Sequence, residues 1–265
     1  MISEARAIAP PSLALMRETP WKVLGGLACA FATIAMLSFV GVAGPTALSV
    51  ATIAAAHGGL LATALAWAGS TRTITLTGIG LLTIAAAAAQ THRYGGAAYV
   101  VIPVWIFWLS RAGRLRQLGL GTRCAPVAIG IGVLAGAFLG AHVLVSAALT
   151  FGYRGRLEPD ALIPWVLYDI GAHVPATCAF FIGGLFNRAQ RTASLAAATA
   201  LATAATVARY LVDPLLPHVV ELLVGAVFYI SLLSVIACWL YWRFGSLMPA
   251  LAMWLVFFVA YRALR

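Results

Sequence analysis

The sequence predicts an all-α fold, a polytopic transmembrane helical bundle of about eight or nine spans. Hydrophobic residues make up 63% of the 265-residue chain and charged residues only 9%, whereas a soluble domain carries about 25% charged residues. The apolar stretches are long and lack the two-residue alternation of a membrane-barrel strand. Because only helices and closed barrels satisfy all backbone polar groups in lipid, a helical bundle is the architecture that remains.

Nine stretches approach the roughly 20 apolar residues that a transmembrane helix requires. The chain before them, residues 1–21, has no apolar core of a cleaved signal, so we expect a short cytoplasmic lead. Residues 22–265 are then a single transmembrane domain. Its candidate spans are 22–43, 46–70, 72–90, 96–110, 124–150, 161–187, 193–215, 218–242 and 245–262.

The lysines and arginines of alternate loops predict the orientation of the bundle. With the N-terminus inside, eleven of them fall on the cytoplasmic side and five on the other side. The positive-inside rule then places the N-terminus and the 111–123 loop in the cytoplasm, and the membrane is expected to be the bacterial cytoplasmic membrane. Arg262 and Arg265 count against this assignment and leave the side of the C-terminus open.

The net charge of +10 is interpreted as a consequence of topology and of contact with anionic membrane lipid. Nucleic-acid binders gather their basic residues on one exposed face, so no nucleic-acid partner is expected. The chain contains no CxxC pair and no HExxH spacing, so neither a metal nor a cofactor is expected. The cysteines are interpreted as small buried side chains, and three histidines as isolated packed or interfacial residues: Cys29, Cys124, Cys178, Cys238, His57, His92 and His142.

Small residues predict where helices approach closely in lipid. Residues 192–208 are rich in alanine, serine and threonine, which predicts that this span lies in the interior of the bundle. Gly132, Gly136 and Gly140 recur every four residues on the 124–150 span and form a face for close helix packing.

Charged residues within spans are costly in lipid and mark either function or a paired structural contact. Asp169 and His173 are four residues apart and share a helix face. With the predicted topology, six polar residues on three consecutive helices lie between the membrane centre and the outer edge and could form one pocket. They are Asp169, His173, Arg209, Asp213, His218 and Glu221. The alternative is structural: an Arg209–Asp213 pair within one helix, with His218 and Glu221 as interface residues.

The second half of the chain, about residues 114–259, resembles the CAAX-protease and bacteriocin-processing (CPBP, or Abi) family of intramembrane proteases. "RQLGLGTR" at 116–123 and "IGIGVLAGAFLG" at 129–140 look like that family's Leu-Gly-Leu entry into a glycine-rich helix. "CAFFIGGLF" at 178–186 has the shape of its Glu-Glu-x-x-x-Arg-Gly motif, and "LATAATVARYL" at 201–211 lies where it has Phe-x-x-x-His. "GSLMPALAMWLVFF" at 245–258 looks like its last helix, which ends in His-x-x-x-Asn.

The family's catalytic residues are replaced at the matching positions. The resemblance implies a glutamate base at Cys178 or Ala179, an arginine at Gly183, and a phenylalanine and a histidine at Ala205 and Arg209. It also implies a histidine at Trp254 and an asparagine at Phe258. A general base needs a titratable group, and an oxyanion site needs hydrogen-bond donors. Neither the base nor the donor set is present at these positions.

These observations predict a non-catalytic membrane protein, a CPBP-like pseudoprotease that serves as an accessory or partner-binding subunit. Its partners are expected to be membrane lipid and other membrane protein subunits. The first alternative is an active intramembrane protease or other membrane enzyme that uses the outer Asp/His/Arg/Glu pocket. The second is a small-molecule transporter.

Overall fold

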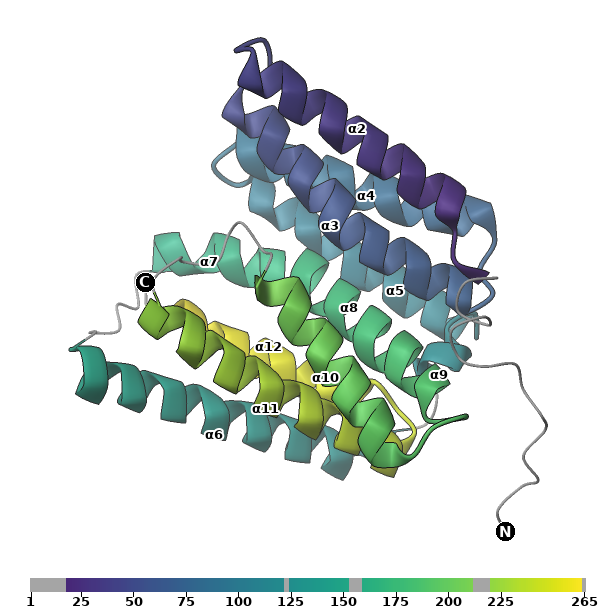
Figure 1. Ribbon diagram of the computed structural model, residues 1–265, viewed down its shortest axis with the longest axis vertical. Coiled ribbons are helices and arrows are strands. Elements are labelled where there is room, and N and C mark those ends of the chain that lie inside the picture. Colours follow the sequence, from purple (N-terminus) through teal and green to yellow (C-terminus); the bar gives the residue numbers. More distant parts are fainter. Residues whose placement is uncertain (1–17, 122–123, 153–158, 212–219, 264–265) are drawn as a thin grey trace.

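The computed structural model describes residues 18–121, 124–152, 159–211 and 220–263, and every regular element in these ranges is a helix (Figure 1). The predicted all-α class is confirmed. One group of helices, drawn in purple and blue, contains α2 (Trp21–Phe39), α3 (Pro45–Trp67), α4 (Arg72–Thr91) and the continuous pair η1 (Gly95–Val100) and α5 (Val101–Arg111).

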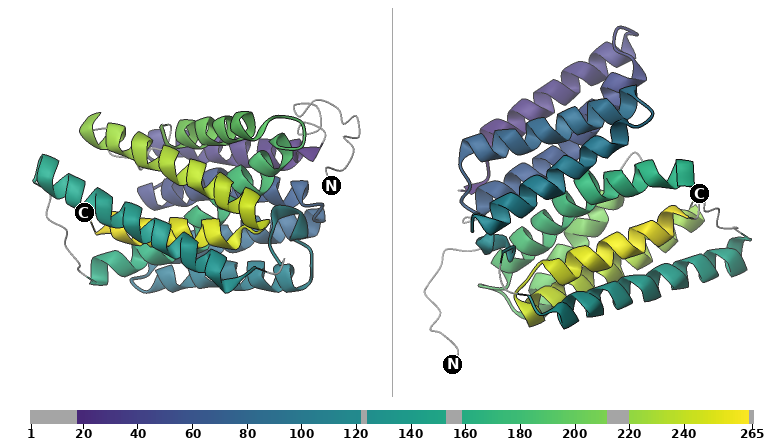
Figure 2. Two further views of the ribbon diagram at one scale, coloured as in Figure 1. Left: turned by 90° about the horizontal axis from the view of Figure 1, so that it is seen from below. Right: turned by 180° about the vertical axis from the view of Figure 1, so that it is seen from behind.

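The second group of helices is joined to the first by the short η2 segment (Arg116–Leu118). It contains α6 (Pro126–Phe151), α10 (Leu195–Leu211), α11 (Val220–Phe244) and α12 (Met248–Arg262). One long, irregular helix lies between the two groups (Figure 1 and the right view of Figure 2). Its parts are α7 (Pro159–Tyr168), the π-helical η3 (Asp169–His173), α8 (Val174–Thr177), the π-helical η4 (Cys178–Phe186) and α9 (Asn187–Ala189).

Proline and glycine set several of the helix limits. Pro45, Pro126 and Pro249 stand in the first turns of α3, α6 and α12, where a missing N–H costs nothing. Gly152 and Gly245 have φ angles of 69° and 62°, and this left-handed conformation ends α6 and α11 at little steric cost.

Each of the nine predicted stretches contains a helix within the described residues, but the expected number of spans is too high. Within the described ranges, six helices are long and apolar enough to cross a membrane, and three apolar helices are shorter. The shorter ones are Gly95–Arg111, Leu195–Leu211 and Met248–Arg262. The last has 15 residues, about 22 Å at the helical rise, whereas the hydrocarbon core is about 30 Å thick.

The interior of the bundle is occupied by the irregular central helix and not by α10. In the most apolar 18-residue window of Leu162–Ala189, 78% of the residues are buried. The prediction for residues 192–208 is wrong, because α10 buries only the face with Ala198, Ala202, Thr206 and Tyr210. Small side chains permit a close approach on one face, but they do not require neighbours on every side.

The glycine face predicted on the 124–150 span is confirmed, and its partner is α12. A Cβ atom added to Gly132 would lie 2.2 Å from the carbonyl oxygen of Pro249, and one added to Gly136 would lie 2.3 Å from that of Met253. Such distances exclude any side chain, so the two helix backbones touch along this face.

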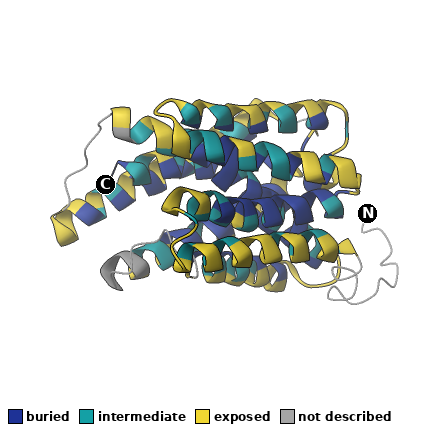
Figure 3. Cartoon of the chain, turned by 90° about the horizontal axis from the view of Figure 1, so that it is seen from above, coloured by how far each residue is buried: buried dark blue, intermediate teal, exposed yellow. Residues whose placement is uncertain are grey.

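The outer surface of the bundle is apolar. Figure 3 shows the buried residues between the helices and the exposed ones along the outer faces. Phe39 is 92% exposed, Leu149 83% and Leu134 71%. Such a surface suits lipid, in agreement with the long apolar helices, and the protein is membrane-embedded.

Candidate functional site

The centre of the candidate site is a buried ion pair between the central helix and the end of α12. Arg262 donates from Nε to Oδ2 of Asp169 and from Nη2 to Oδ1, both at 2.8 Å. The two side chains are 9% and 2% exposed. The guanidinium carbon also lies 4.6 Å from the ring centroid of Trp165. A two-point guanidinium–carboxylate pair of this kind is among the strongest polar contacts a protein makes.

His173 extends the ion pair into a chain of three hydrogen-bonded groups. Its Nδ1 lies 2.9 Å from Oδ1 of Asp169, and its Nε2 is hydrogen-bonded to the Tyr210 hydroxyl on α10. A carboxylate paired with arginine only accepts hydrogen bonds, so Nδ1 of His173 donates. The neutral imidazole then accepts at Nε2 from Tyr210.

His57, on α3, joins the same cluster from the first group of helices. Its Nε2 lies 3.1 Å from Nη2 of Arg209 and 3.1 Å from the Tyr168 hydroxyl. Its ring meets that of His173 edge-on, with centroids 5.8 Å apart. Arg209 itself lies with its guanidinium carbon 4.8 Å from the ring centroid of Tyr210. The cluster therefore connects α3, the central helix, α10 and α12.

Three of the six residues predicted to form one pocket lie in this cluster: Asp169, His173 and Arg209. Asp213, His218 and the side chain of Glu221 lie outside the described residues. Asp169 pairs with Arg262 on α12, a residue outside the predicted set.

Three members of the cluster were missed by the sequence interpretation. Arg262 is the last residue of the last predicted span, and its disagreement with the charge distribution is a usable signal. His57 was interpreted as isolated, and it is not, because the relevant contact spans 111 residues. Tyr210 gives no signal in the sequence. His142 also has a partner, the Tyr229 hydroxyl at 2.6 Å.

The positions where the CPBP resemblance implies histidine and asparagine are filled by aromatic rings that pack on this cluster. Trp254 is 1% exposed and Phe258 4%. The Phe258 ring lies 4.5 Å from that of His173, edge-on, and is stacked on that of Tyr210 at 6.4 Å. The Trp254 ring lies 6.2 Å from that of Tyr210. Where the family would present polar groups, this chain presents a closed aromatic wall.

The remaining motif positions are also fully used in packing. Cys178 and Ala179 are buried. A Cβ atom on Gly183 would lie 3.0 Å from the carbonyl oxygen of Leu118, which leaves no room for an arginine. Ala205 packs against the hydrophobic core from α10.

Two of the segments that carry the resemblance contact each other. The backbone N–H of Leu247, in the Gly-Ser-Leu turn, donates to the carbonyl oxygen of Gly119 at 3.0 Å. Gly119 has a φ of 74°, and a Cβ atom there would lie 2.6 Å from the Tyr241 ring. A glycine is therefore required at position 119, both because of its backbone conformation and because the last two helices approach it closely.

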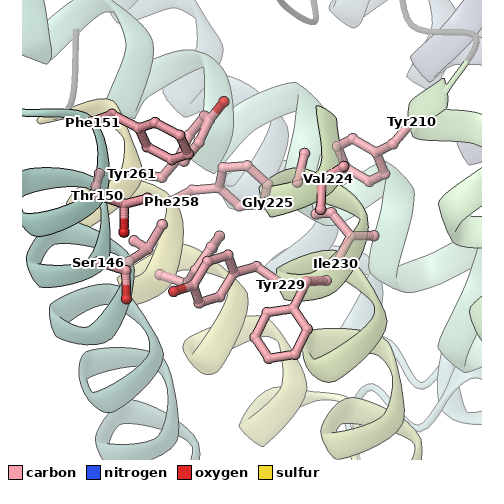
Figure 4. Close-up of a pocket in the computed structure, with 15 residues that line it drawn as sticks. Ser146, Thr150, Phe151, Tyr210, Val224, Gly225, Tyr229, Ile230, Phe258 and Tyr261 are labelled. Carbon is pink, nitrogen blue, oxygen red and sulfur yellow. The ribbon is translucent and has the colours of Figure 1, made fainter. Parts of the chain in front are cut away.

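A membrane-facing cavity of about 350 Å³ adjoins the cluster between α6, α11 and α12. Tyr210 and Phe258 form part of its wall. Hydroxyl groups in the mainly apolar lining come also from Ser146, Thr150, Tyr229 and Tyr261 (Figure 4). A hydrophobic group could approach the aromatic wall through this cavity without leaving the membrane.

Among the described residues, no three His, Cys, Asp or Glu side chains come together in a way that could hold a metal ion. Cys178 and Cys238 are buried thiols, as expected, whereas Cys29 is exposed on α2 and Cys124 is partly exposed.

Comparisons with known proteins found no family model, no curated protein and no solved structure that matches this chain.

Proposed function

We propose that this membrane protein is a non-catalytic, CPBP-like pseudoprotease that acts as a partner-binding accessory subunit of a membrane complex. It resides in a bacterial cytoplasmic membrane with its N-terminus in the cytoplasm. Its role is to hold a hydrophobic segment of another subunit. The 350 Å³ cavity beside Tyr210 and Phe258 is a place where such a segment could rest.

The observation that carries the proposal is the replacement of the implied catalytic groups by a closed aromatic wall. Trp254 and Phe258 are buried against Tyr210 and His173. The nearest described carboxylate, Asp169, already accepts three hydrogen bonds from Arg262 and His173. A carboxylate held in this way is a poor general base, since proton uptake would break its pair with the guanidinium.

A second candidate function is favoured by the order of groups in the cluster. Asp169, His173 and Tyr210 form an acid–imidazole–hydroxyl chain, and Tyr210 borders the membrane-facing cavity. An imidazole oriented by a carboxylate can activate a hydroxyl nucleophile. On this alternative the protein is a membrane enzyme that acts on a hydrophobic substrate.

Peptide cleavage by the reconstituted protein distinguishes the two candidates. The parent and the His173→Gln, Tyr210→Phe and His92→Gln variants would each be incubated with prenylated and with leader-type peptides. The last variant is a matched control, because His92 is exposed at the end of α4, away from the cluster and the cavity. A pseudoprotease gives no product above a mock preparation in any sample. Cleavage by the parent and by His92→Gln, lost in the other two, would establish the enzyme.

The accessory role is tested separately by cross-linking. A photoreactive amino acid at Phe228, an exposed residue that lines the cavity, should cross-link one defined membrane protein in cells. The same probe at Leu134, exposed on α6, should not give that product. Cross-links to lipid alone from both positions would contradict a subunit held in this cavity.

A further inference from the structure

A second apolar groove lies between the two groups of helices, away from the Tyr210 cavity. It has a volume of about 340 Å³. The first group contributes Leu61 on α3 and Ile106 and Phe107 on α5, and the second contributes Leu251 and Leu255 on α12. Phe107 is 60% exposed, so the groove opens toward the surrounding lipid.

One end of this groove is closed by the basic segment that follows α5. Leu115, Leu118 and Leu120 of that segment line the groove, while its arginines point outward. Arg111, Arg114 and Arg116 are all exposed. The Arg111 guanidinium lies 5.3 Å from the ring centroid of Phe107, a residue of the groove wall. Positive charge therefore stands directly at the end of an apolar channel.

No acidic residue of this chain is close in sequence to these arginines. The sequence contains no aspartate or glutamate between Glu18 and Glu158. Glu18 is paired with Arg188, and Asp160 lies 3.6 Å from Arg93. Among the described residues no ion pair involves Arg111, Arg114 or Arg116. Within the described residues the charge at the mouth of the groove therefore has no carboxylate partner, and it suits an anionic ligand.

We propose that this groove binds one anionic phospholipid, with an acyl chain between α3, α5 and α12 and its phosphate at Arg111 and Arg114. An acyl chain matches the apolar lining, and a phosphate at the membrane interface matches the arginines, each of which contributes about 1 kcal/mol of attraction near an anionic surface. Arginine also binds phosphate oxygens through two parallel N–H groups. The bound lipid joins the two groups of helices. This site does not depend on the pseudoprotease proposal.

Lipid binding to the full-length protein in detergent tests the site. Native mass spectrometry would measure retention of 1-palmitoyl-2-oleoyl phosphatidylglycerol and of the phosphatidylcholine with the same chains. The expected result is preferential retention of one phosphatidylglycerol. Arg111→Gln with Arg114→Gln should weaken its binding by roughly tenfold or more, while Arg111→Lys with Arg114→Lys should restore most of it.

Two controls separate the site from general surface charge and from the headgroup alone. Arg93→Gln removes an exposed arginine that is paired with Asp160 elsewhere on the protein, and it should leave retention unchanged. Dihexanoyl phosphatidylglycerol keeps the headgroup but cannot fill the groove, and it should bind much more weakly. Ala252→Trp should fill the groove and displace the lipid, whereas Leu134→Trp on α6 should not.

The proposal fails if the two lipids are retained equally by the parent protein. It also fails if Arg93→Gln weakens binding as much as the double variant, or if the short-chain lipid binds as well as the long-chain one. The last two comparisons need no substitution in the groove, so they stand even if Ala252→Trp does not fold.

Discussion

Asp169 and Arg262 are 93 residues apart in the sequence, and they form a two-point ion pair with both donor–acceptor distances at 2.8 Å. The pair fixes the last turn of α12 on the central helix. It also accounts for the arginine that disagreed with the charge distribution, because Arg262 is a buried structural partner and not a loop residue that sets topology.

Removing one member of this pair is expected to destabilise the protein strongly. Arg262→Ala leaves the carboxylate of Asp169 buried without its counter-ion, which typically costs about 3–5 kcal/mol. Thermal unfolding in detergent, followed by circular dichroism, should show that the unfolding midpoint of this variant lies far below that of the parent. Arg243→Ala is the control. Because Arg243 is exposed on α11, this substitution should change the free energy of unfolding by no more than about 0.5 kcal/mol. Equal melting of the two variants would mean that the pair contributes nothing.

Replacing both partners is expected to cost less than replacing one. Asp169→Asn with Arg262→Met removes both charges, so no uncompensated charge remains in the interior. Its unfolding midpoint should lie closer to that of the parent than the midpoint of Arg262→Ala does. A double variant less stable than the single one would show that Asp169 acts mainly through His173.

The contact between α6 and α12 predicts a position-specific response to one added methyl group. Gly136→Ala places a Cβ atom 2.3 Å from the Met253 carbonyl oxygen, and the forced separation of the helices should cost about 1–3 kcal/mol. Gly130→Ala is the matched control on the same helix, because nothing lies within 4 Å of its added Cβ atom. That variant should be neutral or slightly more stable, since alanine favours the helix. Similar effects from both would contradict the close packing.

The aromatic wall is expected to be structural as well as inactive. Trp254→Ala removes a fully buried ring beside Tyr210 and Phe258, and truncations of this size typically cost about 3–5 kcal/mol in a core. Trp242→Ala, at a ring that is 51% exposed, should cost much less. The comparison of unfolding midpoints checks this. A Trp254→Ala variant with the same unfolding midpoint as the parent would indicate a loosely packed site instead of a closed one.

The one-sided burial of α10 predicts an alternating labelling pattern. In a background without native cysteines, a lipid-soluble maleimide should react with cysteine at Leu201, Ala204 and Ala208, all of which are exposed. It should react poorly at Ala198 and Ala202, which are fully buried. If the cysteines at all five positions were protected from the maleimide, α10 would lie in the interior of the bundle, as its composition predicts.

Much of this architecture was determined by the sequence alone. In the part of the chain that the structure describes, each of the nine apolar stretches forms a helix, because in lipid each segment must satisfy its own backbone. The glycines at 132, 136 and 140 indicated a packing face, since a repeat of four residues keeps one side of a helix free of side chains. Asp169 and His173 could be placed together for the same reason: a spacing of four residues lies on one helix face.

Only the tertiary structure decided which residues complete the site. His57 reaches the cluster from α3, Arg262 from α12 and Tyr210 from α10, and no local spacing connects these three positions. Composition also does not predict which helices lie inside the bundle and which at its surface, because the free energy of an apolar helix is similar whether it faces lipid or protein. The irregular central helix lies inside and α10 at the side because long-range packing, with its glycine contacts and its buried ion pair, distinguishes between surfaces that hydrophobicity treats as equal.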